Sequence, residues 1–231
     1  MGQLPLALAL ADHARFETFV GGSNAAAVRH ARALADGEPG IVWVSGPAAS
    51  GKTHLLQAAC RNAAQAGRRA MYLALLDEHA AEPAILSGLD GLDLLALDHV
   101  EVVARDAAWE RQLFLLFNEI AAKPGGLLLA SRAPAVASGF ELRDLASRAA
   151  GAIAYRLQPL VHGERVDALL VHARARGLEL ERGAAEYLLD RVDRDMATLG
   201  RWLDRLDRES LVEQRRITIP FIRARLSADP T

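Results

Sequence analysis

Short apolar runs alternate with longer amphipathic segments through the first two thirds of the chain. Residues 41–44, 70–75, 92–97, 127–130 and 153–157 form compact apolar runs, which is typical of buried strands. Residues 25–34, 54–64 and 109–121 repeat apolar side chains every three or four positions, which predicts helices. Alternating strands and helices predict an α/β fold, with a parallel sheet covered by helices on both faces.

The pattern changes after Pro159. Helical periodicity continues over residues 164–176, 181–192 and 196–211, but no further alternation with strands follows. We therefore predict a boundary near residue 158, between an α/β base over residues 25–158 and a small α-helical domain over residues 159–231. Residues 1–24 show no regular apolar period, so no packed element is predicted there.

Composition narrows the function classes. The net charge of −2 over 231 residues offers no basic footprint, so direct sequence-specific DNA binding is not expected. A single cysteine, Cys60, excludes an internal disulfide framework and is expected in the core. No apolar run reaches 18 residues, so no membrane span and a cytoplasmic location are expected.

The segment after the first predicted strand matches the P-loop pattern G-x-x-x-x-G-K-[ST] at every fixed position. Its residues are Gly46, Pro47, Ala48, Ala49, Ser50, Gly51, Lys52 and Thr53, and His54 follows at the start of the predicted helix. Glycine lets the backbone curl so that its amides face phosphate oxygens, and the helix N-terminus favours the same anions. We predict that these residues bind ATP or ADP, with Lys52 at the terminal phosphates and Thr53 as a Mg²⁺ ligand.

Two later strands carry candidate partners for this loop. Asp98 ends the run at 92–97 and is predicted as the second Mg²⁺ ligand. The next residue is His99, where hydrolytic P-loop proteins usually carry a carboxylate, and Glu101 is two residues further on. Turnover by this chain alone is therefore left open. Ser131 follows the run at 127–130 and would either contact the γ-phosphate or simply start a turn.

These features, in this order and with a helical lid, resemble the AAA+ ATPases. Residues 16–24 are similar to the entry segment of the bacterial replication initiator DnaA, and residues 144–148 are similar to its arginine-finger box. Residues 217–221 resemble the C-terminal end of Hda, a short DnaA homologue, and the match to the Hda family runs over essentially the whole chain. The resemblance implies an AAA+ base over residues 25–158, preceded by an entry segment over residues 11–24.

The N-terminus resembles the Hda peptide that docks on the DNA polymerase sliding clamp. Within residues 1–10, the clamp-binding residues implied are Gln3, Leu4, Pro5, Leu6 and Leu8. Gln3 can form a hydrogen bond at the rim of an apolar groove, the leucines can fill it, and Pro5 favours an extended peptide. DnaA continues from its lid into a helix-turn-helix domain, which is not expected here.

The resemblance also implies roles for two arginines. Arg148 would act in trans as a catalytic finger on ATP bound to DnaA, and Arg194 in the lid would sense this chain's own nucleotide. ADP is the working ligand implied, while the orthodox P-loop leaves ATP open. The predicted function is a clamp-dependent negative regulator of replication initiation that promotes hydrolysis of DnaA-bound ATP. The alternative is an autonomous AAA+ ATPase, acting as a helicase loader or a DnaA-like recruitment factor, and self-association fits both.

Overall fold

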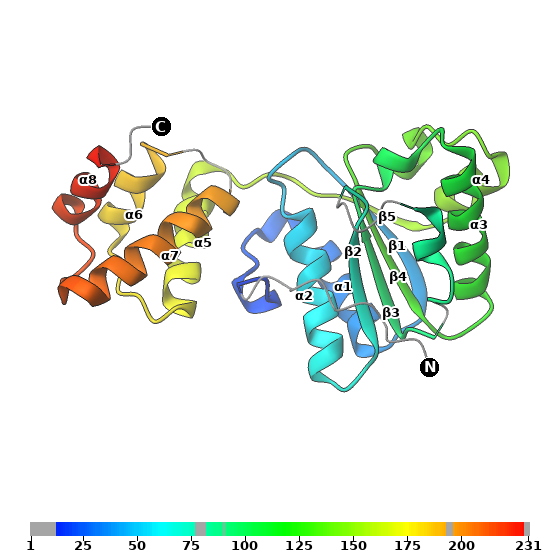
Figure 1. The fold of residues 1–231 in the computed structure, drawn as a ribbon, viewed down its shortest axis with the longest axis horizontal. Coiled ribbons are helices and arrows are strands. Elements are labelled where there is room, and N and C mark those ends of the chain that lie inside the picture. The colour runs from blue at the N-terminus through cyan, green and yellow to red at the C-terminus, as the bar shows by residue number, and fades with distance from the viewer. Residues whose placement is uncertain (1–12, 77–81, 90, 193–195, 229–231) are drawn as a thin grey trace. The chain divides into compact units, whose positions relative to one another are not determined.

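The computed structural model describes residues 13–76, 82–89, 91–192 and 196–228. The chain divides into two units, Met1–Pro159 and Leu160–Thr231, each with its own core. Figure 1 shows a helix-flanked sheet in the first unit and only helices in the second.

A parallel sheet forms the centre of the first unit. Its strands are β1 (Gly40–Ser45), β2 (Ala70–Ala74), β3 (Leu94–Asp98), β4 (Gly126–Ser131) and β5 (Ile153–Arg156). Their order is β2-β3-β4-β1-β5, and every pairing is parallel. Ser45 pairs with Ser131 and Ala74 with Asp98, so the carboxyl ends of four strands meet at one edge. Parallel α/β sheets bind their ligands at that edge.

Helices cover both faces of this sheet (Figure 1). Helices α1 (Ala25–Asp36) and α2 (Lys52–Gln65) pack on the face that carries Val42 and Leu128. Helices α3 (Ala107–Ala121) and α4 (Arg143–Ala150) pack on the face that carries Trp43 and Leu129. Successive strand residues point to opposite faces, so these apolar strands are buried on both sides. The predicted α/β fold class is confirmed.

The segment before α1 corrects the prediction that residues 1–24 hold no packed element. Two 3₁₀ helices, η1 (Phe16–Thr18) and η2 (Gly22–Asn24), lie there, and Phe16 is buried in the core with α1 and α2. The Asn24 amide donates to the carbonyl of Gln158 and accepts from its backbone N–H, both at 2.9 Å. Single-turn helices leave no repeating pattern in the sequence, which is why periodicity missed them.

A buried carboxylate fixes the start of α4. Glu110, on α3, is 2% exposed and accepts hydrogen bonds from the backbone amides of Arg105, Glu141 and Leu142 at 2.7–3.1 Å. These amides lie before α3 and just before α4, where the N-terminal N–H groups of a helix need acceptors from outside it. Glu110 thus joins three segments of the chain.

The second unit consists of helices around their own apolar core. The helices are α5 (His162–Ala175), α6 (Arg182–Leu189), α7 (Met196–Glu213) and α8 (Ile219–Ser227). Leu169, Leu188, Leu203 and Ile222 are fully buried in this core. Helix α8 was not predicted as a helix, because it is short and its pattern is weak. Thr218 caps it by accepting a hydrogen bond from the Phe221 amide.

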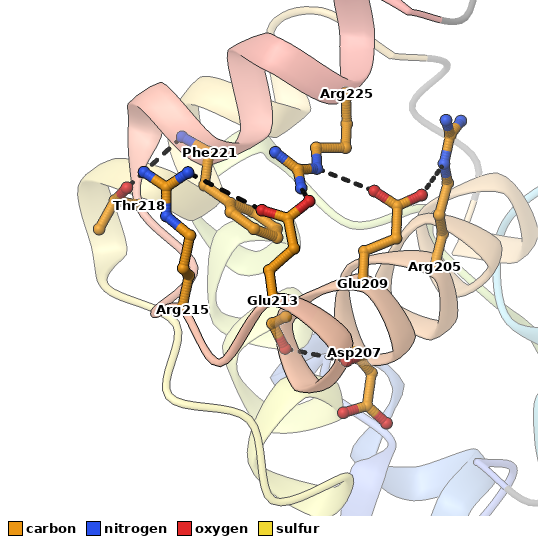
Figure 2. Close-up of polar contacts among 9 residues, drawn as sticks. Arg205, Asp207, Glu209, Glu213, Arg215, Thr218, Phe221 and Arg225 are labelled. Carbon is orange, nitrogen blue, oxygen red and sulfur yellow. Dashed lines mark hydrogen bonds and ion pairs between the residues drawn. The ribbon is translucent and has the colours of Figure 1, made fainter.

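Charged residues join α7 to α8, as Figure 2 shows. Glu209 lies between two arginines, accepting hydrogen bonds from the Nε atoms of Arg205 and Arg225, each at 2.8 Å. Arg225 also pairs with Glu213, and its guanidinium stacks 3.7 Å from the ring centroid of Phe221. Because Arg225 joins two turns of α7 to α8, this network sets how the last helix packs.

We expect Glu110→Ala to destabilise the base. Loss of the carboxylate leaves buried amides without an acceptor, so the free energy of unfolding should fall by about 2–4 kcal/mol. The matched control is Glu119→Ala, at an exposed position of α3, which should change it by about 0.5 kcal/mol or less. Urea denaturation of the full chain, followed by circular dichroism, measures both. Equal stability of the two variants would contradict the role given to Glu110.

Candidate nucleotide-binding site

The P-loop connects β1 to α2 at the carboxyl edge of the sheet. A Cβ on Gly46 would lie 2.7 Å from the carbonyl oxygen of Leu157 and 2.8 Å from Ser50 Oγ, so only glycine fits there. Gly51 has φ +91° and Ala49 has φ +59°, so the loop turns through left-handed conformations. At each fixed glycine of the motif, an added Cβ would thus lie close to a neighbouring residue.

One buried hydroxyl of the loop has no partner of its own. Ser50 is 4% exposed, and its Oγ forms no hydrogen bond with any described residue. The N–H groups in the first turn of α2 likewise have no intrahelical acceptor, as in any α-helix. Unused donors around a curled backbone suit the oxygens of a phosphate group. The loop therefore fits the polyphosphate that its sequence predicts.

The Lys52 ammonium lies over the loop. Its Nζ donates hydrogen bonds to the carbonyls of Gly46 and Pro47, both at 2.8 Å, and the residue is 8% exposed. Burial lowers the pKa of Lys52, the carboxylates of Asp98 and Glu101 act in the opposite direction, and Arg132 adds to the lowering. Those three charges therefore lie within electrostatic reach of the ammonium.

Both predicted Mg²⁺ ligands come together. The Thr53 hydroxyl donates to Asp98 Oδ2 at 2.6 Å, which joins the start of α2 to the end of β3. The Tyr72 hydroxyl donates to the same oxygen at 3.1 Å, and the amide of His99 donates to Oδ1 at 2.9 Å. Asp98 is fully buried. Sequence reasoning missed Tyr72, since nothing in its own segment marks it as a partner of Asp98.

His99 and Glu101 follow Asp98 closely. His99 has φ +59°, in the left-handed region that few residues with a side chain adopt, and its Nδ1 lies 3.6 Å from Asp98 Oδ1. Glu101 Oε1 lies 3.6 Å from Nε of Arg132, the residue after β4. Sequence reasoning left Glu101 without a direction and missed Arg132. The parallel alignment of β3 and β4 could have indicated this pair.

Ser131 faces away from Asp98. Its hydroxyl accepts a hydrogen bond from the Trp43 indole at 2.9 Å and donates to the carbonyl of Ala133. The side chain is buried on the sheet face that packs against α3 and α4. Of the two alternatives for Ser131, this geometry favours the structural one over contact with a γ-phosphate.

The entry segment packs beside the P-loop through His54. The His54 imidazole donates to the carbonyl of Arg15 at 2.9 Å, and the edge of its ring meets Phe19 at 5.4 Å between centroids. Phe19 would also lie 3.0 Å from a Cβ on Gly51. Burial lowers the pKa of His54 below its usual value. The side chain of His54 is thus engaged by the entry segment, while its backbone lies in the first turn of α2.

The predicted arginine finger, Arg148, lies on α4. It is exposed, its guanidinium is 5.7 Å from the ring centroid of Phe114, and among the described residues no carboxylate pairs with it. Arg194 lies outside the described residues, as does the predicted clamp-binding set Gln3, Leu4, Pro5, Leu6 and Leu8.

Each of the two units matches a family model of known proteins. Residues 10–154 match the family model of the bacterial DnaA ATPase domain, and residues 162–226 match the lid domain of Hda. The chain belongs to the bacterial DnaA ATPase-domain family. It is a Hda/DnaA-like AAA+ protein, as the sequence predicted.

Solved structures share this fold. Domain III of Thermotoga maritima DnaA superposes with a TM-score of 0.74, at 21% identity, over 93% of this chain and 95% of that one. Aquifex aeolicus DnaA bound to AMPPCP superposes with a TM-score of 0.67, at 26% identity, over 82% of this chain and 63% of that one. The Thermotoga maritima RuvB branch migration motor gives 0.65, at 20% identity, over 93% of this chain and 73% of that one. This chain thus spans less than two thirds of the AMPPCP-bound Aquifex DnaA.

Among residues 13–76, 82–89, 91–192 and 196–228, no helix has the length and apolar character that a membrane span requires. No group of three or more histidine, cysteine, aspartate or glutamate residues lies among them in an arrangement that could hold a metal ion. A Mg²⁺ ion at Thr53 and Asp98 would accordingly need phosphate oxygens and water as its other ligands.

We expect Gly46→Ala to distort the P-loop. The added methyl group would press on a backbone carbonyl, so the free energy of unfolding should fall by about 1–3 kcal/mol. The control is Gly183→Ala in α6, where a Cβ meets nothing within 4 Å. That variant should be unchanged or more stable by about 0.5–1 kcal/mol, because alanine favours helix. Urea denaturation curves compare the two, and a harmless Gly46→Ala would mean the loop has room to relax.

Proposed function

We propose that this DnaA-related protein is a sliding-clamp-dependent negative regulator of chromosomal replication initiation, which promotes hydrolysis of ATP bound to DnaA. Its DnaA-type base and Hda-type lid support this placement among replication regulators. The chain would act on a nucleotide held by its partner, while its own nucleotide sets the shape that is competent to assemble. Its partners would be DnaA and the clamp, and self-association remains compatible with an AAA+ fold.

The observation that carries the proposal is the state of Arg148. An exposed guanidinium that no described carboxylate neutralises is free to meet an anion on another molecule. Helix α4 is held in place by Glu110, so the arginine projects from a fixed support. An arginine finger supplied in trans stabilises charge on the transferring phosphoryl group and is typically worth about 10³–10⁵ in rate.

The chain's own nucleotide would be ADP or ATP with Mg²⁺, held by residues 46–54. Lys52 would leave the P-loop carbonyls to meet the terminal phosphates, and Thr53 and Asp98 would hold the metal ion. Arg194 is proposed as the lid residue that senses this nucleotide. AMPPCP in two related DnaA structures supports a nucleotide in the corresponding place.

Clamp dependence rests on the N-terminal peptide alone. Gln3, Leu4, Pro5, Leu6 and Leu8 would add an extended segment to an apolar groove of the clamp. Holding the chain on clamp-loaded DNA would raise its effective concentration near DnaA without any new contact to DnaA.

A second function, autonomous ATP hydrolysis as a helicase loader or recruitment factor, is favoured by one observation. Lys52, Thr53 and Asp98 are all assembled within this chain, around a P-loop with no departure from its pattern. His99, at the position where a carboxylate usually polarises water, opposes it. The two functions differ in whose ATP is consumed.

The proposed function predicts how fast DnaA-bound ATP decays on clamp-loaded DNA. Radiolabelled ATP pre-bound to DnaA should decay quickly with the wild-type chain, and Arg148→Ala should slow this by about 10³-fold or more. Gln3→Ala should also slow the decay, because it weakens tethering to the clamp. An excess of the Gln3→Ala protein should then restore the rate. Arg143→Ala, an exposed arginine five residues earlier on α4, is the matched control and should retain most of the activity.

The autonomous function predicts steady-state ATP turnover by the purified chain. Under our proposal, the wild-type chain turns over ATP slowly or not at all. Lys52→Ala should therefore abolish nucleotide binding but leave the already low rate of ATP turnover almost unchanged. Colorimetric phosphate release measures turnover, and equilibrium dialysis with labelled ADP measures binding. Rapid turnover that Lys52→Ala abolishes would replace the proposed function with the second one.

A further inference from the structure

Tyr72 reaches the candidate Mg²⁺ ligand Asp98 from the neighbouring strand. Tyr72 lies on β2 and pairs with Ala96 on β3, so its side chain shares a face of the sheet with Asp98, two residues further along β3. Its hydroxyl donates to Asp98 Oδ2 at 3.1 Å. Tyr72 is 8% exposed and Asp98 is fully buried. A carboxylate buried this deeply depends on donors from within the chain, and Tyr72 is one of them.

Thr53 donates to the same oxygen as Tyr72. Thr53 Oγ1 lies 2.6 Å from Asp98 Oδ2, and the amide of His99 donates to Oδ1 at 2.9 Å. The carboxylate is thus held from α2, from β2 and from the residue after β3, which fixes its orientation. A hydroxyl group carries one proton and two lone pairs. Because Thr53 donates its proton to Asp98, its lone pairs remain for a cation.

We propose that Tyr72 is a positioning residue for Mg²⁺ at the nucleotide site, acting through Asp98. The proposal rests on the proposed binding of a nucleotide by the P-loop. Mg²⁺ prefers oxygen ligands, so the hydroxyl of Thr53 and the carboxylate of Asp98 fit this ion. A group that forms a hydrogen bond with a metal-binding carboxylate fixes its orientation, and its loss typically costs about 10–100-fold in metal affinity. Tyr72 occupies this place beside Asp98.

The Tyr72 ring also packs in the core beside α1 and α2, so a substitution must preserve the ring. Tyr72→Phe does so and removes only the hydroxyl. Tyr155→Phe is the matched control, because Tyr155 lies on β5, at the opposite edge of the sheet from β2. Its hydroxyl lies 3.1 Å from Nδ1 of His30. The control therefore removes a tyrosine hydroxyl from the same sheet without disturbing the hydrogen bonds of Asp98.

Isothermal titration calorimetry on the full chain measures ADP affinity in excess Mg²⁺ and again in EDTA. The ratio of the two affinities is the Mg²⁺ enhancement, which a change confined to packing would leave unaltered. The wild-type chain and Tyr155→Phe should show the same enhancement. In Tyr72→Phe the enhancement should fall by about tenfold, while ADP affinity in EDTA stays within about twofold of wild type. Urea denaturation reports whether each variant is folded.

A second comparison tests the route through Asp98. Asp98→Asn removes the charge that Tyr72 is proposed to orient. Adding Tyr72→Phe to Asp98→Asn should then change the Mg²⁺ enhancement by less than about twofold, because two residues that act through one contact are not additive.

Three results would overturn the proposal while leaving nucleotide binding by the P-loop intact. They are a wild-type enhancement in Tyr72→Phe, an equal loss of ADP affinity with and without Mg²⁺, and a further large loss when Tyr72→Phe is added to Asp98→Asn. The second result would make the hydroxyl purely structural. A wild-type chain that binds no ADP under either condition would instead refute nucleotide binding, and this proposal with it.

Discussion

The burial of a parallel sheet on both faces is the constraint on which the rest of the base depends. Each strand must place apolar side chains on two sides, so polar chemistry is excluded from the interior and gathers at the carboxyl edge. There Asp98 at the end of β3 meets Thr53 at the start of α2, 2.6 Å apart between their oxygens. That contact joins the two segments that would share a metal ion.

A few charged groups determine the electrostatics at this edge of the sheet. Lys52 is nearly buried, yet two carboxylates hold back the lowering of its pKa that burial produces. Asp98 is satisfied by three donors, from Thr53, Tyr72 and His99, whereas one oxygen of Glu101 has none among the described residues. The two acids therefore differ in their contacts: Asp98 accepts hydrogen bonds from several donors, whereas Glu101 pairs with Arg132.

The face that carries Arg148 depends on a different buried carboxylate. Glu110 contacts neither Arg148 nor the P-loop in any described hydrogen bond, but it fixes the chain just before α4. The base thus carries its two candidate sites on separate elements, the P-loop edge and the arginine on α4. This separation suits a protein whose own nucleotide and whose action on a partner are distinct, as the proposed function requires.

The sequence by itself determined the fold class, the strand–helix alternation and the residues of the P-loop, because these follow from local periodicity and a contiguous motif. It also placed Asp98 at the end of a strand. Tertiary structure alone decided the partners. Alternation along the strands points Ser131 toward Trp43 on one face of the sheet and Asp98 toward Thr53 on the other. Neither contact can be predicted from one segment of the sequence. The Glu101–Arg132 pair, the Tyr72 hydrogen bond and the packing of Phe16 likewise arise from residues distant in sequence. Hydrogen bonds and charges act through space, so only the folded chain determines which groups they join.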